Sequence, residues 1–494
     1  MSALGNGRIV KDFYPVAEKF GAVTIVEDRQ TGRLIYLVIE PPLSDDEKKK
    51  LEEIKNLLIE TIDVELIEAG KEDIRKYLEK KIEHIIKKYR IKVAKEAIDK
   101  LKYYLIRDIM GYGKIDVPMK DKNIEDISCD GVGVPIYVWH RFYESIPTNV
   151  IFETEEELRA FITKLAYKAK RQVSIANPIV DGILPEGYRV HLTLGEVSRK
   201  GGTFTIRKFR EEPFTVVDLV ILKTMSPLMA AYFWLLLEYG KSIMVLGATA
   251  AGKTTTLNAI AMLIRPEAKI ITIEETPELR LPHENWVPLV TRPTRSAMAE
   301  NVTLFDLLKA SLRMRPDYII VGEIRGEEAY TLFQAIATGH SGLSTMHAEN
   351  VDYAIKRLTI HPMNIPKPLV PVMNVFAHIA RVKIGDRIER RIVGVYEVEG
   401  YDAEKDEFLI TKVFGWDALR NSYVYVGTSR VLEKISEDKF VSISMLNSEL
   451  KKRERLISLM AKRNQRSFEQ VSKVVRNYYF NPEMTYRLVE AGAV

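Results

Sequence analysis

The spacing of hydrophobic positions changes several times along the chain, and each change predicts a different kind of element. Compact apolar runs near the N-terminus predict β-strands. Residues 44–109 then carry apolar side chains at helical spacing, which predicts three amphipathic helices with short connections, beginning at a capping box of Ser44 and Glu47. We therefore expect strands and a small helical bundle over residues 1–111. The strand-like runs are residues 22–26 and 34–39.

The pattern between residues 112 and 210 alternates short apolar runs with turns and one capped helix. This predicts an α+β, PAS-like subdomain. One of its strands puts Arg189 on the polar face, and the next carries Arg207. Residues 211–225 read as a linker to the rest of the chain.

Residues 226–494 read as repeated β-α units followed by strand pairs and basic helical segments. Strands that alternate with helices are typical of a parallel sheet. We therefore predict an α/β domain with a parallel-sheet core and a C-terminal extension, preceded by an α+β N-terminal domain that includes the helical bundle.

One glycine-rich turn has the spacing of a phosphate-binding loop, G-x-x-x-x-G-K-[ST], between an apolar strand and a helical pattern. Gly247 and Gly252 let backbone N–H groups converge on a phosphate, and the helix N-terminus adds partial positive charge. Lys253 supplies a full charge to the β- and γ-phosphates, and Thr254 offers a hydroxyl to Mg²⁺. The alternative is a turn that binds nothing. The predicted loop is Gly247, Ala248, Thr249, Ala250, Ala251, Gly252, Lys253, Thr254 and Thr255.

Three glutamates follow buried strands of this predicted domain. Glu323 comes shortly after the apolar run 318–321, and the carboxyl edge of a parallel sheet is where ligands bind. A carboxylate there can polarise an attacking water molecule. Glu274 and Glu275 end a neighbouring strand and can order the water or the metal shell. Glu275 is explained equally well as an acid that balances a helix dipole.

His340 and His347 flank one short predicted strand. Their spacing suits a sensor of the γ-phosphate, and it suits a structural role equally well. A metal site is not expected, because no carboxylate or cysteine joins them at ligand spacing.

Composition narrows the possible classes of protein. The formal charge of +5 over 494 residues is too small to indicate a dedicated nucleic-acid binder. The single cysteine, Cys129, excludes an intrachain disulfide. The most hydrophobic run, 228–237, is too short to span a bilayer. The lysine-rich helical faces are either solvated or a docking surface for an acidic partner or an anionic membrane. These lysines are Lys48, Lys49, Lys50, Lys80, Lys81, Lys87 and Lys88.

Four motifs in this order resemble the secretion ATPases of type II secretion and type IV filament systems. They are the phosphate loop at 247–255, the acidic box at 273–278, the segment 315–323 and the histidine box at 338–347. The stretch 124–131 and the helical N-terminal segment look like the archaeal branch of that family.

The resemblance implies a RecA-like, homohexameric ATPase that uses ATP and Mg²⁺. It would work in the cytoplasm, peripherally at the inner face of the cytoplasmic membrane, and exert force on an integral-membrane platform protein. Neither a membrane span of its own nor a nucleic-acid partner is expected. The family's phosphate-approaching arginines would be Arg189 and Arg207. Glu323 would be catalytic with Glu274, His340 and His347, and Thr254 and Glu275 would serve the metal.

One departure from the family and two alternatives remain. The acidic box usually reads Glu-Asp, whereas this chain has Glu274 followed by Glu275, so the metal contact there is open. Within the family, a pilus or secretion motor is favoured over an archaellum assembly and rotation motor. The alternative from another class is a ring NTPase that translocates nucleic acid.

Overall fold

The computed structural model describes residues 7–17, 20–61, 71–209, 212–292, 301–385 and 387–492, without the side chains of 71–73. The chain forms two compact units, Met1–Phe209 and Arg210–Val494. The expected boundary at residues 210 and 211 lies outside the described residues.

The first unit is built on a nine-stranded sheet with the order β1-β2-β3-β6-β5-β4-β9-β8-β7. Neighbouring strands are antiparallel except β3 and β6, which pair in parallel through Tyr36 and Thr148. This pairing joins strands of the predicted segments 1–111 and 112–210 in one sheet. The strands are β1 (Arg8–Ala17), β2 (Gly21–Asp28), β3 (Leu34–Ile39), β4 (Ile124–Cys129), β5 (Pro135–His140), β6 (Glu144–Ile151), β7 (Ile179–Ile183), β8 (Arg189–Thr193) and β9 (Thr203–Arg207).

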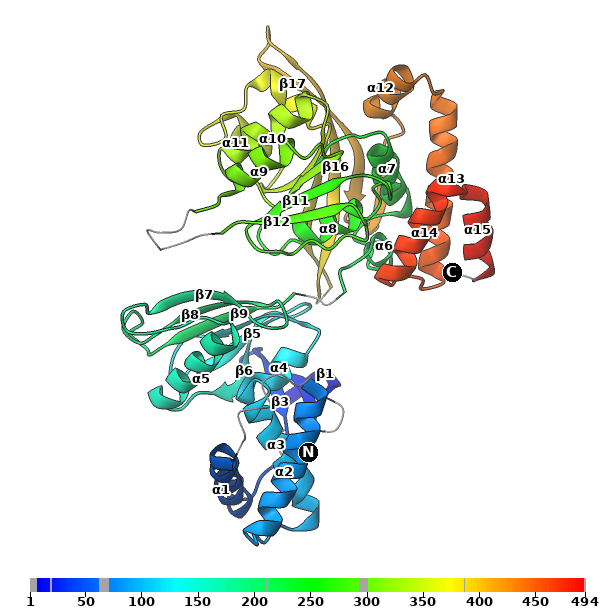
Figure 1. Ribbon diagram of the computed structural model, residues 1–494. Coiled ribbons are helices and arrows are strands. Elements are labelled where there is room, and N and C mark those ends of the chain that lie inside the picture. Colours follow the sequence, from blue (N-terminus) through cyan, green and yellow to red (C-terminus); the bar gives the residue numbers. More distant parts are fainter. Residues whose placement is uncertain are drawn as a thin grey trace. The chain divides into compact units, whose positions relative to one another are not determined.

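Two kinds of helix accompany this sheet (Figure 1). Helix α5 (Glu155–Lys168) begins at the predicted cap Thr154 and buries its apolar side chains against the strands, together with the free Cys129. Short η2 (Gly113–Ile115) and α4 (Asp116–Lys120) precede β4. The predicted bundle is confirmed as α1 (Asp45–Thr61), α2 (Lys71–Lys88) and α3 (Lys95–Ile109), with a core of its own. That core contains Leu51, Ile54, Leu58, Leu78, Ile82, Ile85, Leu101 and Leu105.

The second unit contains the predicted parallel sheet, in the order β12-β11-β13-β14-β10-β15-β16-β17-β18. The strands from β12 to β15 run parallel, and β16 to β18 continue the sheet antiparallel. The parallel strands are β10 (Ile243–Gly247), β11 (Ile270–Glu274), β12 (Trp286–Val290), β13 (Tyr318–Val321), β14 (Ser341–His347) and β15 (Val375–Ile384). The others are β16 (Arg387–Asp402), β17 (Glu407–Asp417) and β18 (Ser422–Tyr425).

Helices cover both faces of this sheet (Figure 1), so each strand side is buried in one of two hydrophobic clusters. One cluster packs under α6 (Val216–Ile221), α7 (Pro227–Glu238) and α8 (Lys253–Ala261). The other packs under α9 (Leu304–Leu312), α10 (Glu328–Ala337) and α11 (Val351–Thr359), followed by the short η3 (Lys367–Val372). Burial on both faces explains why the strands read as continuous apolar runs.

Helix α6 lies within the segment expected to be a linker. Its N-terminus is a capping box of Thr215 and Asp218, and Val216, Val217 and Leu219 are buried in the core of the second unit. Apolar side chains on so short a helix do not show a clear period, so the sequence pattern did not distinguish this helix from a loop.

The C-terminal extension is a helical layer on the outside of α7. Arg453 of α13 is buried, lies 4.8 Å over the Trp234 ring and pairs with Glu238 and Glu449. The buried carboxylate of Glu397 on β16 accepts hydrogen bonds from Tyr232, Ser429 and the backbone of Val431. The helices are α12 (Arg430–Lys439), α13 (Ile443–Lys462), α14 (Phe468–Phe480) and α15 (Pro482–Ala491). Within the described residues, no helix is both long and apolar enough to cross a membrane.

Candidate active site

The carboxyl ends of three parallel strands meet at one edge of the second unit's sheet. Gly247, the last residue of β10, pairs with His347, the last residue of β14. Val321 at the end of β13 pairs with Ser344 of β14. Side chains that follow these strands therefore share one edge, as expected for a ligand site in an open parallel sheet.

The phosphate loop connects β10 to α8 with a tightly constrained backbone. Ala250 and Gly252 have left-handed φ angles of +59° and +96°. A Cβ on Gly247 would lie 2.4 Å from the Ile379 carbonyl of the neighbouring strand β15. Sequence reasoning assigned Gly247 to the approach of phosphate, and the structure adds that the adjacent strand leaves no room for a side chain.

Lys253 is the first residue of α8 and its side chain is largely buried. Its Nζ donates to the Ala248 carbonyl at 3.1 Å and lies 3.3 Å from Nε2 and 3.4 Å from Nδ1 of His347. Burial, followed by the charge of Lys253, lowers the pKa of His347. The ring is therefore neutral near pH 7 and can accept a hydrogen bond at one nitrogen while it donates from the other.

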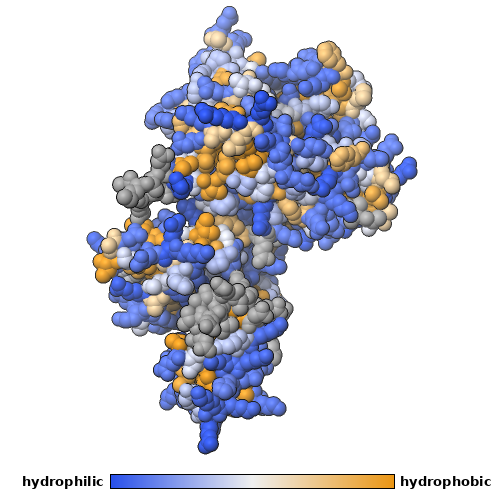
Figure 2. Space-filling model, viewed as in Figure 1, coloured by the Kyte–Doolittle hydropathy of each residue, from blue (hydrophilic) through white to orange (hydrophobic). Residues whose placement is uncertain are grey.

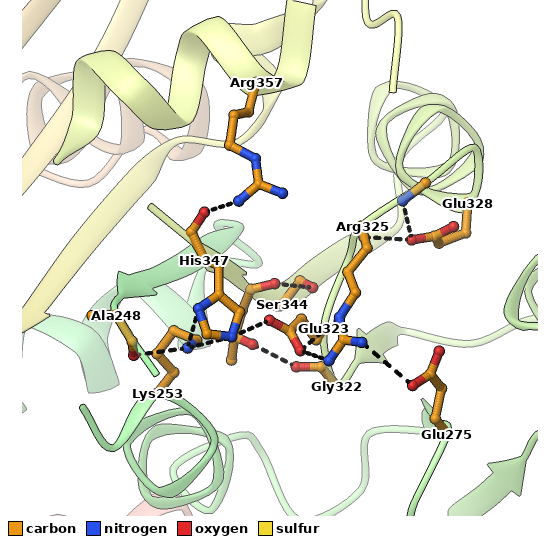
Figure 3. A network of polar contacts seen from close by, with 12 residues as sticks. Ala248, Lys253, Glu275, Gly322, Glu323, Arg325, Glu328, Ser344, His347 and Arg357 are labelled. Atoms are coloured by element: carbon orange, nitrogen blue, oxygen red, sulfur yellow. Dashed lines mark hydrogen bonds and ion pairs between the residues drawn. The ribbon is translucent and has the colours of Figure 1, made fainter. Parts of the chain in front are cut away.

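Glu323 lies on the other side of the same histidine. Its Oε1 is 3.1 Å from His347 Nε2, and this buried oxygen has no hydrogen-bond partner among the described residues. The loop that carries Glu323 is fixed from β14, because Thr345 Oγ1 donates to the Gly322 carbonyl at 2.8 Å and Ser344 Oγ donates to the Val321 carbonyl at 2.8 Å. A cation, an imidazole and a carboxylate thus follow one another across the sheet edge (Figure 3).

Arg325 continues this chain of charges (Figure 3). Its Nε donates to Glu323 Oε2 at 3.0 Å, its Nη2 contacts the same oxygen, and its Nη1 lies 3.8 Å from Glu275. Its backbone N–H and that of Gly326 donate to the Glu328 carboxylate at 2.6 and 2.8 Å. Arg325 therefore positions the Glu323 carboxylate and is itself held from α10.

Glu274 and Glu275 occupy different environments although they are adjacent. Glu274 is buried and accepts backbone hydrogen bonds from Glu278 at 3.0 Å and Leu279 at 3.1 Å. Burial raises the pKa of Glu274 to about 7, against the opposing effect of those hydrogen bonds. Glu275 is exposed and contacts Arg325. Glu274 therefore organises the turn after β11, whereas Glu275 is accessible to solvent.

The structure does not bring His340 to this cluster. His340 precedes β14 and its Nδ1 lies 3.1 Å from the Ala335 carbonyl at the end of α10. A strand rises about 3.3 Å per residue, so the seven residues of β14 separate His340 from His347 by roughly 20 Å. The expectation that both histidines serve one site is corrected: within this chain's site, only His347 lies at the edge that carries Lys253 and Glu323.

Arg189 and Arg207 belong to the first unit. They are directly opposite each other on β8 and β9, both side chains are exposed, and the alternate residues Val190 and Ile206 are buried. The predicted alternation of these strands is confirmed. The two guanidinium groups thus form one positive site on the polar face of the first unit's sheet, with Asp126 of β4 in register beside Arg207.

The donor set of the loop fits a nucleoside triphosphate and Mg²⁺. Ala248 and Thr249 are exposed, so a phosphate can reach the backbone N–H groups, the start of α8 and Lys253. Thr254, half-buried in the first turn of α8, can offer a hydroxyl to the metal. No cluster of three metal-binding side chains occurs among the described residues. Mg²⁺ needs none, because it retains water and phosphate ligands alongside one or two protein groups.

Comparison with known proteins assigns the family. Residues 133–382, just over half of the 494-residue chain, match the model of the family described as type II/IV secretion system protein. The chain belongs to this family. A relative from Methanocaldococcus jannaschii, uncharacterized protein MJ0900, is 39% identical over 468 residues, which cover 90% of this chain and 85% of the relative. The type IV secretion system protein PtlH of Bordetella pertussis is 32% identical over 284 residues, covering 51% of this chain and 84% of PtlH.

Solved structures were compared as well. The crystal structure of the Legionella pneumophila ATPase DotB matches with a TM-score of 0.41 and 17% identity, covering 75% of this chain and 92% of DotB. The sequence-based assignment to the secretion ATPases, and of the fold as a RecA-like α/β domain behind an α+β domain, is confirmed.

Sequence reasoning missed two arginines of this secretion ATPase site. Arg325 lies two residues after Glu323, a spacing that carries no recognisable motif. Arg390 of β16 donates from Nε to the Ala250 carbonyl at 3.2 Å, and its Cδ would lie 3.2 Å from a Cβ on Gly252. Only the position of β16 beside β15 brings Arg390 under the loop, so the sequence carries no local signal for it.

The two histidines give a matched test of the site geometry. His347→Ala removes the imidazole between Lys253 and Glu323, so we expect ATP turnover to fall by about 10- to 100-fold. His340→Ala removes a histidine at the opposite sheet edge and should change turnover less than about twofold. Steady-state phosphate release from both purified variants measures this. Equal losses in both variants would contradict the assignment of His347 alone to the site.

Glu274 predicts a pH-dependent stability. The folded chain keeps the Glu274 proton up to about pH 7, whereas the unfolded chain releases it at the ordinary glutamate pKa of 4.5. Folding therefore binds a proton between these values, and the Glu274 contribution to the free energy of unfolding decreases as the pH rises through this window. Glu274→Gln keeps the acceptor oxygen without this proton, so its melting temperature relative to wild type should rise from pH 5 to pH 8.

The control for this experiment is Glu275→Gln, one residue along and exposed. Scanning calorimetry should give the same difference in melting temperature between Glu275→Gln and wild type at pH 5 and at pH 8. If the difference in melting temperature between Glu274→Gln and wild type were the same at every pH, Glu274 would be ionised over the whole range from pH 5 to pH 8.

Proposed function

We propose that this chain hydrolyses ATP to power assembly of a type IV pilus-like filament or protein secretion across the cytoplasmic membrane. The observation that carries the proposal is the contact chain from Lys253 through His347 to Glu323 at the mouth of the phosphate loop. The loop would hold the triphosphate, with Lys253 neutralising charge on the β- and γ-phosphates. Mg²⁺, held by Thr254 with Glu275 as the further candidate, would supply charge neutralisation when bound.

Glu323 is the residue that would activate the attacking water. A general base must lie within hydrogen-bond reach of the water that attacks the γ-phosphate. The imidazole of His347 contacts both Glu323 and Lys253, the lysine that would bind that phosphate. Arg325 donates to Oε2 of Glu323, which sets the orientation of the carboxylate before substrate binds, and Oε1 of Glu323 lies 3.1 Å from His347 Nε2. Glu274 would keep the neighbouring turn in place.

We further propose a homohexamer in which Arg189 and Arg207 are the phosphate-contacting arginines that the resemblance implies. Arg189 and Arg207 are exposed and lie side by side, which suits two donors to one phosphate group. The enzyme would act peripherally at the inner face of the cytoplasmic membrane and exert force on an integral-membrane platform protein. Membership of the type II/IV secretion system family and the similarity to PtlH support this assignment.

Glu323→Gln tests the catalytic assignment. The amide cannot accept the proton of the attacking water, so we expect turnover to fall at least about 100-fold. ATP affinity, measured with a fluorescent ATP analogue, should stay within about threefold, because Lys253 and the loop are intact. Lys253→Ala should instead abolish binding.

The matched control is Glu327→Gln, an exposed glutamate four residues further on, which should keep wild-type turnover. Full activity in Glu323→Gln would remove Glu323 from catalysis. Failure of the wild-type chain to bind ATP would remove the proposed function altogether.

The arginine pair tests the proposed ring. If these two cations contact the bound nucleotide, Arg189→Ala and Arg207→Ala should lower turnover at least about tenfold in the assembled hexamer. Arg199→Ala, an exposed arginine outside the pair, is the control. Turnover should be followed together with light scattering across a range of protein concentrations. Unchanged rates in assembled rings of both variants would exclude this pair from the site.

A further inference from the structure

The turn between α2 and α3 is the most uniformly charged part of the helical bundle. Between residues 87 and 95 the chain carries five cationic side chains and no acidic one. All five are exposed, and none forms an ion pair with another described residue. We call this set the basic turn; it consists of Lys87, Lys88, Arg90, Lys92 and Lys95.

Other lysines of the same bundle are in a different situation, because many of them are neutralised locally. Lys48 pairs with Asp45, Lys55 with Glu52 and Lys102 with Glu83. Lys50 and Lys100 likewise have carboxylate partners on α1. The sequence alone did not separate paired lysines from unpaired ones, whereas the structure places five cations without an ion pair to a described residue together at one turn.

The basic turn lies at the end of the bundle away from the sheet. Helix α3 runs toward the sheet, because Tyr103 and Arg107 near its C-terminus bond to Glu40 directly after β3. The turn before its N-terminus therefore lies at the opposite end, where the surface in Figure 2 is predominantly hydrophilic. Its backbone is sharply folded at Arg90, whose φ is +53°, so the cations spread over a rounded tip.

We propose that the basic turn docks the protein electrostatically on an anionic lipid surface. Four to eight clustered Lys and Arg residues are the sequence feature that attracts peripheral proteins to acidic headgroups. Tyr89 is 44% exposed with the Lys88 ammonium 5.5 Å from its ring centroid, an amphipathic side chain suited to headgroup depth.

A shaped protein partner fits this tip less well. Specific protein interfaces require a desolvated apolar centre, and Tyr89 is the single exposed large hydrophobic side chain in the described part of the basic turn. The half-buried Ile91 and Val93 face the core of the bundle. An anionic lipid surface is flat and its negative charge is diffuse, so binding to it requires only accessible positive charge. The basic turn provides that charge. The docking proposal rests on the proposed function in one respect, because the proposed function places the protein at a membrane.

The test uses the full-length protein and sedimentation with vesicles of phosphatidylcholine containing about 30% phosphatidylglycerol. The tip variant combines K87Q, K88Q, R90N, K92Q and K95Q, with Asn at 90 because it tolerates a positive φ. The control variant combines K48Q, K49Q, K50Q, K55Q and K80Q, which removes the same charge from the same bundle. Circular dichroism and ATP turnover without lipid verify that both variants are folded and active.

We expect the tip variant to bind anionic vesicles at least about tenfold more weakly than wild type, and the control variant to stay within about twofold. Wild-type binding should fall steeply as salt rises from about 0.05 to 0.5 M, and phosphatidylcholine alone should not bind. Equal weakening in both variants would show that net charge and not this turn is responsible, which overturns the proposal. Wild-type binding no better to anionic than to neutral vesicles would overturn it too and leave an acidic protein as the partner.

These outcomes are separable from failure of the proposed function. ATP turnover is measured without lipid, and no residue of the basic turn belongs to the candidate site in the second unit. If the enzyme is active but does not bind anionic vesicles, only the docking proposal is refuted. An inactive enzyme that still binds them through the basic turn removes only the proposed hydrolysis.

Discussion

The in-register pairing of three parallel strands is the constraint on which the site depends. Because Gly247 pairs with His347, the loop after β10 begins beside the last side chain of β14. Because Val321 pairs with Ser344, the segment that carries Glu323 leaves the sheet at the same edge. A shift of one residue in either pairing would turn alternate side chains to the other face. Helices on both faces bury the central strands β10, β11, β13 and β14 and so fix the register.

The charges at this edge form a continuous series and not a set of separate pairs. Lys253 contacts His347, His347 contacts Glu323, Glu323 contacts Arg325, and Arg325 lies near Glu275. The series alternates in sign around a neutral imidazole, so each charge is compensated although the groups are partly removed from water. Under the proposed function, a bound triphosphate would add several negative charges next to Lys253 and would compete with His347 for its ammonium group. Changes at the loop can thereby reach Glu323 through one side chain.

The sequence was sufficient for features that local physics determines. The capping box at Ser44 and the glycine turn ending in Lys253 formed as expected, because their partners lie within a few residues. Glu323 lies at the carboxyl edge of the sheet, because strand direction in a βα unit is fixed. His340 was misjudged because two histidines that flank a strand look equivalent until its direction places one at each end of the sheet.

Contacts between distant segments account for what the sequence did not reveal, and they bear directly on how the loop is supported. Arg390 is 140 residues from Ala250 in the chain, yet it donates to the loop carbonyl at 3.2 Å. Ile379 of β15 closes the other side, since its carbonyl would clash with a Cβ on Gly247. The antiparallel hairpin of β15 and β16 therefore packs against the phosphate loop and supports its backbone. A loop with its backbone fixed in this way would lose less conformational freedom on binding a phosphate, so under the proposed function more of the binding energy would be left for other steps.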